Sequence, residues 1–330
     1  MKIISFLSVA GLLFSCHSST DKVVSVSYKS DFGLDTVGHP ELMTVEDDYA
    51  GGTTVFHLKD RLLLGGPYSQ YQLYSYPELR RLNKMITFPK NTWSSVLDQK
   101  LYSYNNGRFS IHKLDNRDSL VCDSVFSVSG IVPMDFQRID RLNDQTYIFS
   151  DYGGDHAPFY LLDLKNKTLT PKGRNLEDRS RFKNEEEYRS AYRHVIRVKP
   201  DQSAFVEAYC FCPRIRIYNS SCVLTYDLFL DNPPGNDKVV PVEYEKRYVF
   251  CDVINVTDHF IYILNRAQPL PYQSSNCNLL VLDWKGNLVA RYRLDLFIYS
   301  FFVEGDDRSL FGTCWKEPEG FRFFRLKLSY

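Results

Sequence analysis

Apolar and polar positions alternate in short runs along most of the chain, and polar turns separate these runs. The runs are four to nine residues long and rich in β-branched and aromatic side chains, which is typical of β-strands. Clear examples are Thr53–Leu58, Phe159–Leu164, Asn278–Asp283 and Leu288–Leu294. The turns contain Asn, Gly, Asp and Lys, which suit tight hairpins. The pattern predicts an all-β protein.

Six stretches repeat one arrangement: an apolar strand, a polar turn with an aspartate, and a second apolar strand. The turn aspartates are Asp60, Asp98, Asp144, Asp201, Asp258 and Asp307. Their successive spacings are 38, 46, 57, 57 and 49 residues, and each unit continues with a third and usually a fourth strand. This size matches a propeller blade, so we expect a six-bladed β-propeller of four-stranded antiparallel blades. A pair of β-sandwiches and a seven-bladed ring are the alternatives.

The two ends of the repeat array are complementary. The sixth unit stops after three strands, at Phe321–Leu328, whereas the apolar run Val23–Tyr28 precedes the first unit. We expect this N-terminal strand to supply the missing fourth strand and close the ring, because closure removes an exposed sheet edge. Residues 23–330 then form one propeller domain.

One charged segment, residues 175–194, interrupts the strand pattern. Asn184 followed by Glu187 indicates a capping box, and Tyr188, Ala191 and Tyr192 form a narrow apolar stripe at helical spacing. The segment predicts a short helix between the third and fourth blades. It is either a lid over one mouth of the central channel or a connection that packs on the rim.

Composition narrows the class of protein. Lys and Arg total 40 of the 330 residues and Asp and Glu also total 40, so the chain lacks the basic field of a nucleic-acid-binding protein. A hydrophobic content of 44% excludes a disordered chain. Beyond the N-terminus, no run reaches the roughly 18 apolar residues that a membrane-spanning helix needs.

The N-terminus carries an export signal. Lys2 precedes the apolar run Ile3–Phe14, which has the length of a signal-peptide core. The following Leu13-Phe14-Ser15-Cys16 resembles the bacterial lipobox, which implies a signal peptide at 1–15, lipid attachment at Cys16 and a tether at 16–22. Because His17 rather than aspartate follows the cysteine, the resemblance favours the outer membrane, on a face that it leaves undetermined.

The lipobox cysteine, the N-terminal strand and the six aspartate turns together resemble the TolB-like six-bladed β-propeller lipoproteins. This resemblance covers nearly all of the mature chain, but it is architectural. It implies a binding module of the cell envelope with protein partners, and it supplies no catalytic residue to carry over. Fold alone does not determine function.

Seven further cysteines remain after Cys16, an odd number that leaves at least one thiol unpaired. Cys210 and Cys212 share one strand face and Cys222 follows a polar turn, so either could form a disulfide with Cys222. A metal site lacks the usual paired spacing. The favoured interpretation is that these thiols are buried and act as small hydrophobic side chains.

Candidate chemistry is sparse. Asp151, Asp155 and His156 follow a strand in a glycine-containing loop, where they could hold a cation such as calcium or act in acid–base catalysis. A polar hairpin turn is the simpler interpretation, and we expect no other cofactor. The chain contains no GxSxG, HExxH, Walker or strand-borne GxGxxG motif.

Two pairs of residues and one tyrosine cluster are candidate ligand contacts. Arg193 and His194 could bind an anion at the channel mouth, and Arg214 and Arg216 share one strand face that could bind a carboxylate or phosphate. A salt-linked surface cluster is the favoured alternative for Arg193 and His194. The tyrosine cluster could stack on sugars or could pack the blades, and its members are Tyr68, Tyr71, Tyr74 and Tyr76.

Three functions follow from these features. The leading hypothesis is a membrane-anchored, monomeric, non-catalytic binding or scaffold propeller for protein or glycan ligands. The second is a propeller hydrolase of the lactonase or glycan-cleaving type with a site at the channel mouth. The third is a structural envelope protein without a small ligand.

Overall fold

The computed structural model describes residues 24–28, 35–43, 54–66, 70–89, 92–97, 99–128, 136–151, 157–173, 180, 182–230, 247–251, 253–266, 268–270 and 276–330. The predicted signal peptide, Cys16, and the loop residues Asp155 and His156 lie outside the described residues. Within this part of the chain, no helix has the length and apolar character that crossing a bilayer requires.

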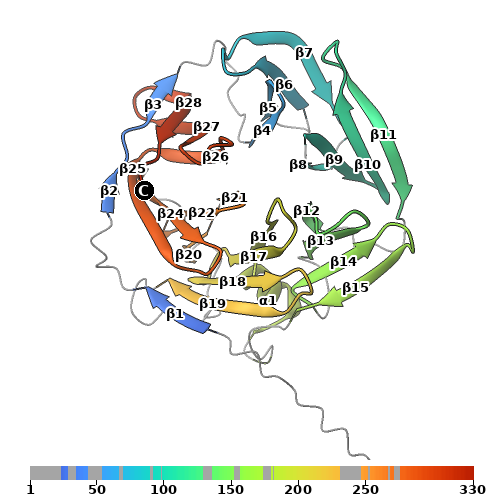
Figure 1. The fold of residues 1–330 in the computed structure, drawn as a ribbon, viewed down its shortest axis with the longest axis vertical. Helices are drawn as coiled ribbons and strands as arrows, with labels where there is room; N and C mark the ends of the chain where they lie inside the picture. The colour runs from blue at the N-terminus through green and yellow to red at the C-terminus, as the bar shows by residue number, and fades with distance from the viewer. Residues whose placement is uncertain are drawn as a thin grey trace, which may run out of the picture.

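Six antiparallel sheets stand around a central axis as the blades of a propeller (Figure 1). Blade 1 consists of β4 (Thr54–Leu58), β5 (Arg61–Gly66), β6 (Gln70–Ser75) and β7 (Arg81–Thr87). Blade 2 consists of β8 (Trp93–Leu97), β9 (Lys100–Asn105), β10 (Arg108–Leu114) and β11 (Leu120–Ser127). Blade 3 consists of β12 (Phe136–Arg141), β13 (Thr146–Asp151), β14 (Phe159–Asp163) and β15 (Thr168–Lys172).

Blade 4 consists of β16 (His194–Val198), β17 (Ala204–Tyr209), β18 (Arg214–Asn219) and β19 (Leu224–Leu230). Blade 5 consists of β21 (Val253–Val256), β22 (Phe260–Asn265), β24 (Asn276–Asp283) and β25 (Leu288–Asp295). Blade 6 contains β26 (Phe297–Val303), β27 (Ser309–Lys316) and β28 (Gly320–Lys327). A small separate sheet pairs β20 (Tyr248–Val249) with β23 (Gln268–Pro269). The first strands of neighbouring blades contact one another, so they surround the axis.

The predicted repeat is confirmed. Five of the turn aspartates lie between the first and second strands of a blade, and the sixth, Asp98, lies outside the described residues. Asp201 illustrates why the residue type recurs, since its carboxylate accepts hydrogen bonds from both the backbone N–H and the hydroxyl of Ser203, at 2.8 and 2.6 Å. The carboxylate therefore fixes the turn locally.

A strand from the N-terminal segment closes the ring, as predicted, but it is not Val23–Tyr28. The fourth strand of blade 6 is β3 (Glu41–Met43), which pairs antiparallel with β28. The strand β1 (Val24–Tyr28) instead adds to the outer edge of blade 4, parallel to β19, and β2 (Asp35–Val37) adds to blade 5, parallel to β25. The segment thus passes along the outside of three successive blades (Figure 1). Alternation identified a strand, but it does not specify which sheet edge that strand joins.

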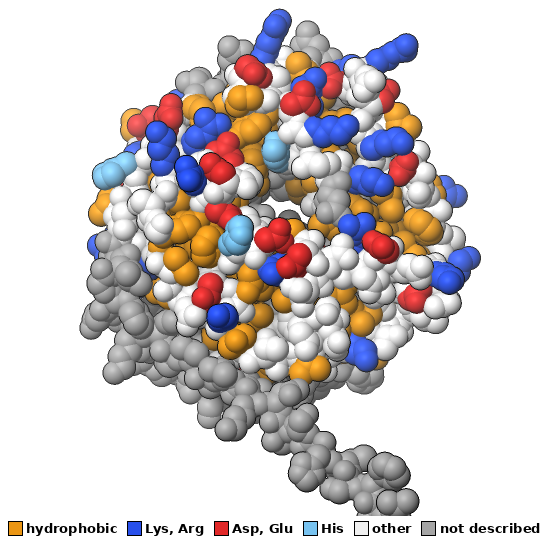
Figure 2. All heavy atoms as spheres, viewed as in Figure 1, with side chains coloured by type: hydrophobic (Ala, Val, Ile, Leu, Met, Phe, Trp, Pro, Cys, Tyr) orange, Lys and Arg blue, Asp and Glu red, His pale blue; other side chains and the backbone are white. Residues whose placement is uncertain are grey.

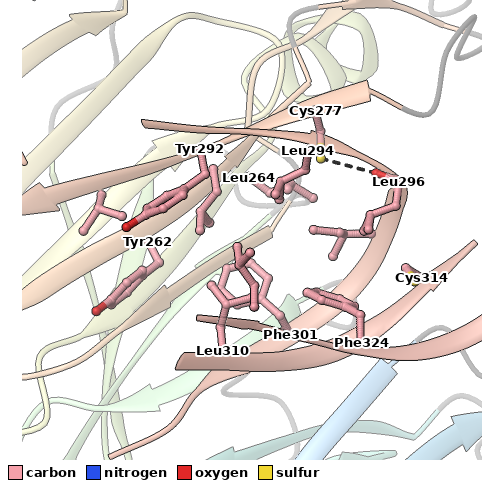
Figure 3. Close-up of a cluster of buried hydrophobic side chains, with 14 of the residues drawn as sticks. Tyr262, Leu264, Cys277, Tyr292, Leu294, Leu296, Phe301, Leu310, Cys314 and Phe324 are labelled. Atoms are coloured by element: carbon pink, nitrogen blue, oxygen red, sulfur yellow. Dashed lines mark hydrogen bonds between the residues drawn. The ribbon is translucent and has the colours of Figure 1, made fainter. Parts of the chain in front are cut away.

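The hydrophobic core is divided into six layers, one between each pair of neighbouring blades. Figure 3 shows the layer between blades 5 and 6, where Leu264 and Tyr292 face Phe301 and Phe324. Both faces of a blade are therefore buried, and the side chains on both faces meet another blade. This division follows from packing twisted sheets face to face around a ring.

The predicted helix is present as α1 (Glu185–Ala191). The Asn184 side chain accepts a hydrogen bond from the Glu187 backbone N–H at 2.8 Å, which confirms the capping interaction. Tyr188, Ala191 and Tyr192 are buried against Tyr209 at the end of β17. In Figure 1 the helix lies over blade 4 and away from the axis, which supports the rim interpretation over the lid.

All seven cysteines among the described residues are free thiols, and most are buried. The bridges considered for Cys222 are wrong, because Cys210 and Cys212 precede β18 whereas Cys222 follows it. A strand of six residues separates the two ends by about 20 Å, and a disulfide needs Cα atoms within about 7 Å.

Candidate functional site

The structure separates the predicted site residues into two groups. Asp151 ends β13, where its backbone pairs with Phe136, and its side chain lies outside the described part of the chain together with Asp155 and His156. Arg193 is half-buried immediately before β16, and its carbonyl accepts the Cys210 N–H at 2.7 Å. The other three predicted residues meet in one network in blade 4.

This network runs across the strands of blade 4 on the face toward blade 3. Glu207, Arg216 and Asp227 occupy directly opposed positions on β17, β18 and β19, so they form one row. Arg214 donates from two nitrogens to the two carboxylate oxygens of Asp227, with Nε at 2.6 Å from Oδ1. The Nε of Arg216 lies 3.7 Å from Oδ2 of the same carboxylate. One aspartate therefore serves two arginines.

The centre of the network is Glu207, which the sequence analysis missed. It is fully buried, and its two carboxylate oxygens accept hydrogen bonds from the hydroxyls of Tyr209, at 2.8 Å, and Tyr218, at 2.9 Å. His194 Nε2 lies 3.6 Å from Oε1. A lone glutamate in the otherwise apolar strand Ala204–Tyr209 is the signal that could have identified it.

Burial and neighbouring charge set the protonation of this network. Burial, together with the charge of Glu207, raises the pKa of Tyr209 and of Tyr218, so both hydroxyls stay protonated and donate. Burial acts to lower the pKa of Arg216, but the fields of Tyr209 and Glu207 outweigh it and leave the pKa raised. Arg216 is therefore cationic inside the fold.

The network satisfies its own charges. The carboxylates of Asp227 and Glu207 occupy the positions where an external anion would meet Arg214 and Arg216. Blade 3 covers this face, where Phe159 packs against Phe205 and Tyr218 at 5.2 and 5.5 Å between ring centroids. The arrangement favours a role in holding blades 3 and 4 together.

A second set of polar side chains links the innermost strands around the channel. Each bond joins a side chain of one blade to the backbone of the next, and together the bonds connect five of the six neighbouring pairs. The side chains are Ser95, Asp140, Arg197, Asn255 and Ser300. Arg197 also lies 3.6 Å from Asp140, the one carboxylate on the innermost strands. These polar residues fasten the ring.

The mouth of the channel carries mixed charge. Figure 2 shows a hollow at the middle of the ring, with acidic, basic and histidine side chains interspersed around it. In the part of the chain that the structure describes, no group of three or more His, Cys, Asp or Glu side chains could hold a metal ion. On the innermost strands, the Asp140 carboxylate is paired with Arg197 at 3.6 Å.

The predicted tyrosine cluster packs the blades. Tyr71 and Tyr74 are buried in the layers on either side of blade 1, and Tyr68 lies outside the described residues. Tyr76 donates its hydroxyl hydrogen to Glu304 between blades 1 and 6. This cluster is therefore not a sugar-stacking surface among the described residues.

A row of aromatic side chains, partly buried apart from the exposed Trp315, lies instead on blade 6 at the end opposite the aspartate turn. Phe297, Trp315 and Phe321 are directly opposed on β26, β27 and β28, and the Trp315 residue is 43% exposed. The Tyr299 ring lies 5.1 Å from that of Phe297 and 6.1 Å from that of Phe321. The guanidinium of Arg266 stacks 3.9 Å from the Phe297 ring centroid. We call these four aromatic residues the blade 6 aromatic row.

No family model matches the chain, and no curated protein matches its sequence. Solved structures share the fold. A member of the DUF4221 family from Bacteroides vulgatus aligns with a TM-score of 0.57 at 11% identity, over 87% of this chain and 97% of that one. A protein from Bacteroides fragilis that is named as exported aligns with a TM-score of 0.56 at 8% identity, over 93% and 99%.

A luciferin-regenerating enzyme aligns less closely, with a TM-score of 0.53 at 10% identity, over 88% of this chain and 96% of that one. At such identities the likeness concerns the fold alone. The chain is a six-bladed β-propeller. None of its described site residues is assigned an activity by these neighbours.

Proposed function

We propose that this chain is an outer-membrane lipoprotein of the TolB-like kind, whose propeller acts as a non-catalytic binding module for a glycan or protein ligand. The lipobox ending in Cys16 supports the lipid anchor. The structural neighbours from Bacteroides, one of them named as exported, support an envelope location. The ligand meets the blade 6 aromatic row.

The observation that carries this proposal is the exposure of Trp315 within that row. An indole with a solvent-facing surface offers a flat apolar platform. Lys316, the next residue on β27, and Asp295, at the end of β25, add charged atoms that lie 4.0 Å apart. A sugar ring stacks through its C–H face while its hydroxyls bond such side chains. Tryptophan, tyrosine and arginine also dominate protein-binding hot spots, so a protein is the second ligand class.

Binding to a printed panel of bacterial and host glycans tests the glycan ligand. Trp315→Ala should weaken binding at least tenfold without shifting the thermal midpoint, because the side chain is exposed. Tyr248→Ala is the matched control, since Tyr248 is 37% exposed on the small separate sheet and should bind as wild type. Equal glycan binding by wild type and Trp315→Ala would contradict the proposal that the blade 6 aromatic row contacts the ligand.

A photo-crosslinking residue at position 315 tests the protein ligand in cells. A single envelope protein that crosslinks to position 315, and does not crosslink when the photo-crosslinking residue is placed at position 248, would show that the ligand is a protein and not a glycan. The anchor is tested separately with Cys16→Ala, which should move the protein from the membrane fraction to the soluble fraction. Continued membrane attachment of that variant contradicts the lipoprotein assignment.

A propeller hydrolase is the alternative function. It would use Asp151, the last residue of β13, together with Asp155 and His156, which follow it in the sequence. Hydrolysis of lactones or oligosaccharides by the purified chain, abolished by His156→Ala, would support this alternative.

A further inference from the structure

His194 lies where three elements meet at the inner end of blade 4. It is the first residue of β16 and it is buried, with 5% of its surface exposed. Its Nδ1 lies 2.9 Å from the carbonyl oxygen of Tyr192, the C-cap residue of α1. Its Nε2 lies 2.7 Å from the carbonyl oxygen of Pro158, immediately before β14 of blade 3. Both ring nitrogens therefore face backbone carbonyls.

A carbonyl oxygen only accepts hydrogen bonds, so each of these two contacts needs an N–H on the ring. A neutral imidazole has one N–H, and its other nitrogen carries a lone pair. In that form, one nitrogen lone pair would face a carbonyl oxygen at hydrogen-bond distance inside the protein, where an unsatisfied polar group is costly. Only the imidazolium, with two N–H groups, satisfies both contacts.

A counter-charge lies beside the ring. Oε1 of the fully buried Glu207 lies 3.6 Å from His194 Nε2. Titratable or charged residues near this pair include Tyr209, whose ring centroid lies 5.3 Å from that of His194, and Tyr218 and Arg216 on the far side of Glu207. Tyr192 and Arg193 directly precede His194 in the chain. The hydroxyls of Tyr209 and Tyr218 each donate a hydrogen bond to a carboxylate oxygen of Glu207.

We propose that His194 is held as a buried imidazolium that pins the end of α1 and the start of β14 to blade 4, with Glu207 as its counter-ion. His194 is then a positioning residue and not the ligand contact that the sequence suggested. This inference does not depend on ligand binding by the blade 6 aromatic row, which lies on another blade.

The test is a long-range proton–nitrogen NMR spectrum of the whole chain labelled with ¹⁵N-histidine at pH 7.5. His194→Gln assigns the His194 signals by their loss. Both His194 nitrogens should show the signature of protonated nitrogen, although an exposed histidine is mostly neutral at this pH. A signature of one protonated and one bare nitrogen overturns the proposal.

His112 is the internal control in the same spectrum. Its Nε2 meets the Ser103 hydroxyl at 2.9 Å, and a hydroxyl can either donate or accept. Burial lowers the pKa of His112, so it should show one protonated and one bare nitrogen. A doubly protonated His112 would mean that the spectrum does not report the local hydrogen-bond geometry of a histidine. The His194 signals would then no longer support the proposal.

Two conservative variants test the counter-ion. Glu207→Gln keeps an oxygen for the tyrosine hydroxyls but removes the charge, so one nitrogen of His194 should become bare at pH 7.5. Asp227→Asn removes a charge from the same row beyond Arg216, and His194 should stay doubly protonated. An unchanged His194 in Glu207→Gln overturns the role of Glu207. The wild-type spectrum decides the protonation state whether or not either variant folds.

Discussion

Removing the carboxylate that two arginines share should strongly destabilise blade 4. Asp227→Ala deletes the paired contact with Arg214, including the 2.6 Å bond from Nε, and the carboxylate oxygen that lies 3.7 Å from Arg216 Nε. Arg216 is buried on the face that blade 3 covers, so it cannot turn to water. The variant leaves a buried cation that has lost one of its two acidic neighbours.

Breaking a buried ion pair by removing one partner costs about 3–5 kcal/mol. The lower end applies here, because the Arg214 side chain keeps 18% of its surface in solvent and Arg216 retains Glu207 as a neighbour. We therefore expect a loss of about 3 kcal/mol in the free energy of unfolding. With roughly 2 °C per kcal/mol for a domain of this size, the thermal midpoint should fall by about 6 °C.

The measurement is urea and thermal unfolding followed by circular dichroism, on wild type and variant at equal concentration. Asp123→Ala is the matched control, since Asp123 also serves two cations, Lys100 at 3.2 Å and Lys113 at 2.9 Å, but on an exposed edge. Water replaces the contacts of such surface ion pairs, so the control variant should have the same unfolding midpoints as wild type. If Asp227→Ala unfolds at the same urea concentration and temperature as Asp123→Ala, the buried network does not stabilise blade 4 and our reasoning is refuted.

Three further predictions follow from packing and protonation. Gly312→Ala should lower the free energy of unfolding by about 1–3 kcal/mol, because a Cβ at this position would collide with a backbone oxygen of β26. Gly305→Ala is the control and should leave stability unchanged, because the space around Gly305 is open. Equal thermal midpoints for the two variants would contradict the close approach at Gly312. Burial raises the pKa of the Cys314 thiol to about 12, so little of the reactive thiolate forms at pH 8. Iodoacetamide at pH 8 should therefore label the exposed Cys122 before Cys314. Equal labelling rates for the two cysteines in the native protein would contradict the burial of Cys314. Burial between two aromatic rings lowers the pKa of His57, so the unfolded state binds the proton more tightly than the folded state does. The free energy of unfolding should therefore fall as the pH drops below about 6.5. A His57→Phe variant whose stability has the same pH dependence as wild type from pH 7.5 to 5.5 would disprove this.

Local chemistry explains why the repeat could be predicted. An aspartate turn is made within a few residues, as the Asp201 carboxylate and Ser203 show, so its signal survives in the sequence. The helix was recognisable for the same reason, since Asn184 caps α1 within one turn. Such features need no knowledge of distant partners.

Pairing between distant segments could not be predicted in this way. The strand β1 has the alternation of a blade strand, but its partner β19 lies about 200 residues away, and nothing within β1 distinguishes blade 4 from blade 6. The three-residue strand β3, which does close the ring, is too short to give a periodic signal. Edge selection depends on where the chain can reach once the blades exist.

The buried charge network of blade 4 has a physical cause that is particular to propellers. Arg214 and Arg216 alternate with isoleucines on β18, a pattern that in an open sheet means one wet face and one dry face. In a ring of blades both faces are covered, so a charged face must find its counter-charge inside the fold. The register supplies it, since Arg216 stands between Glu207 and Asp227. For a chain with this repeat, alternating charge on a middle strand therefore predicts buried acidic partners on the adjacent strands. Exposed side chains are expected near the ends of strands, where Trp315 lies.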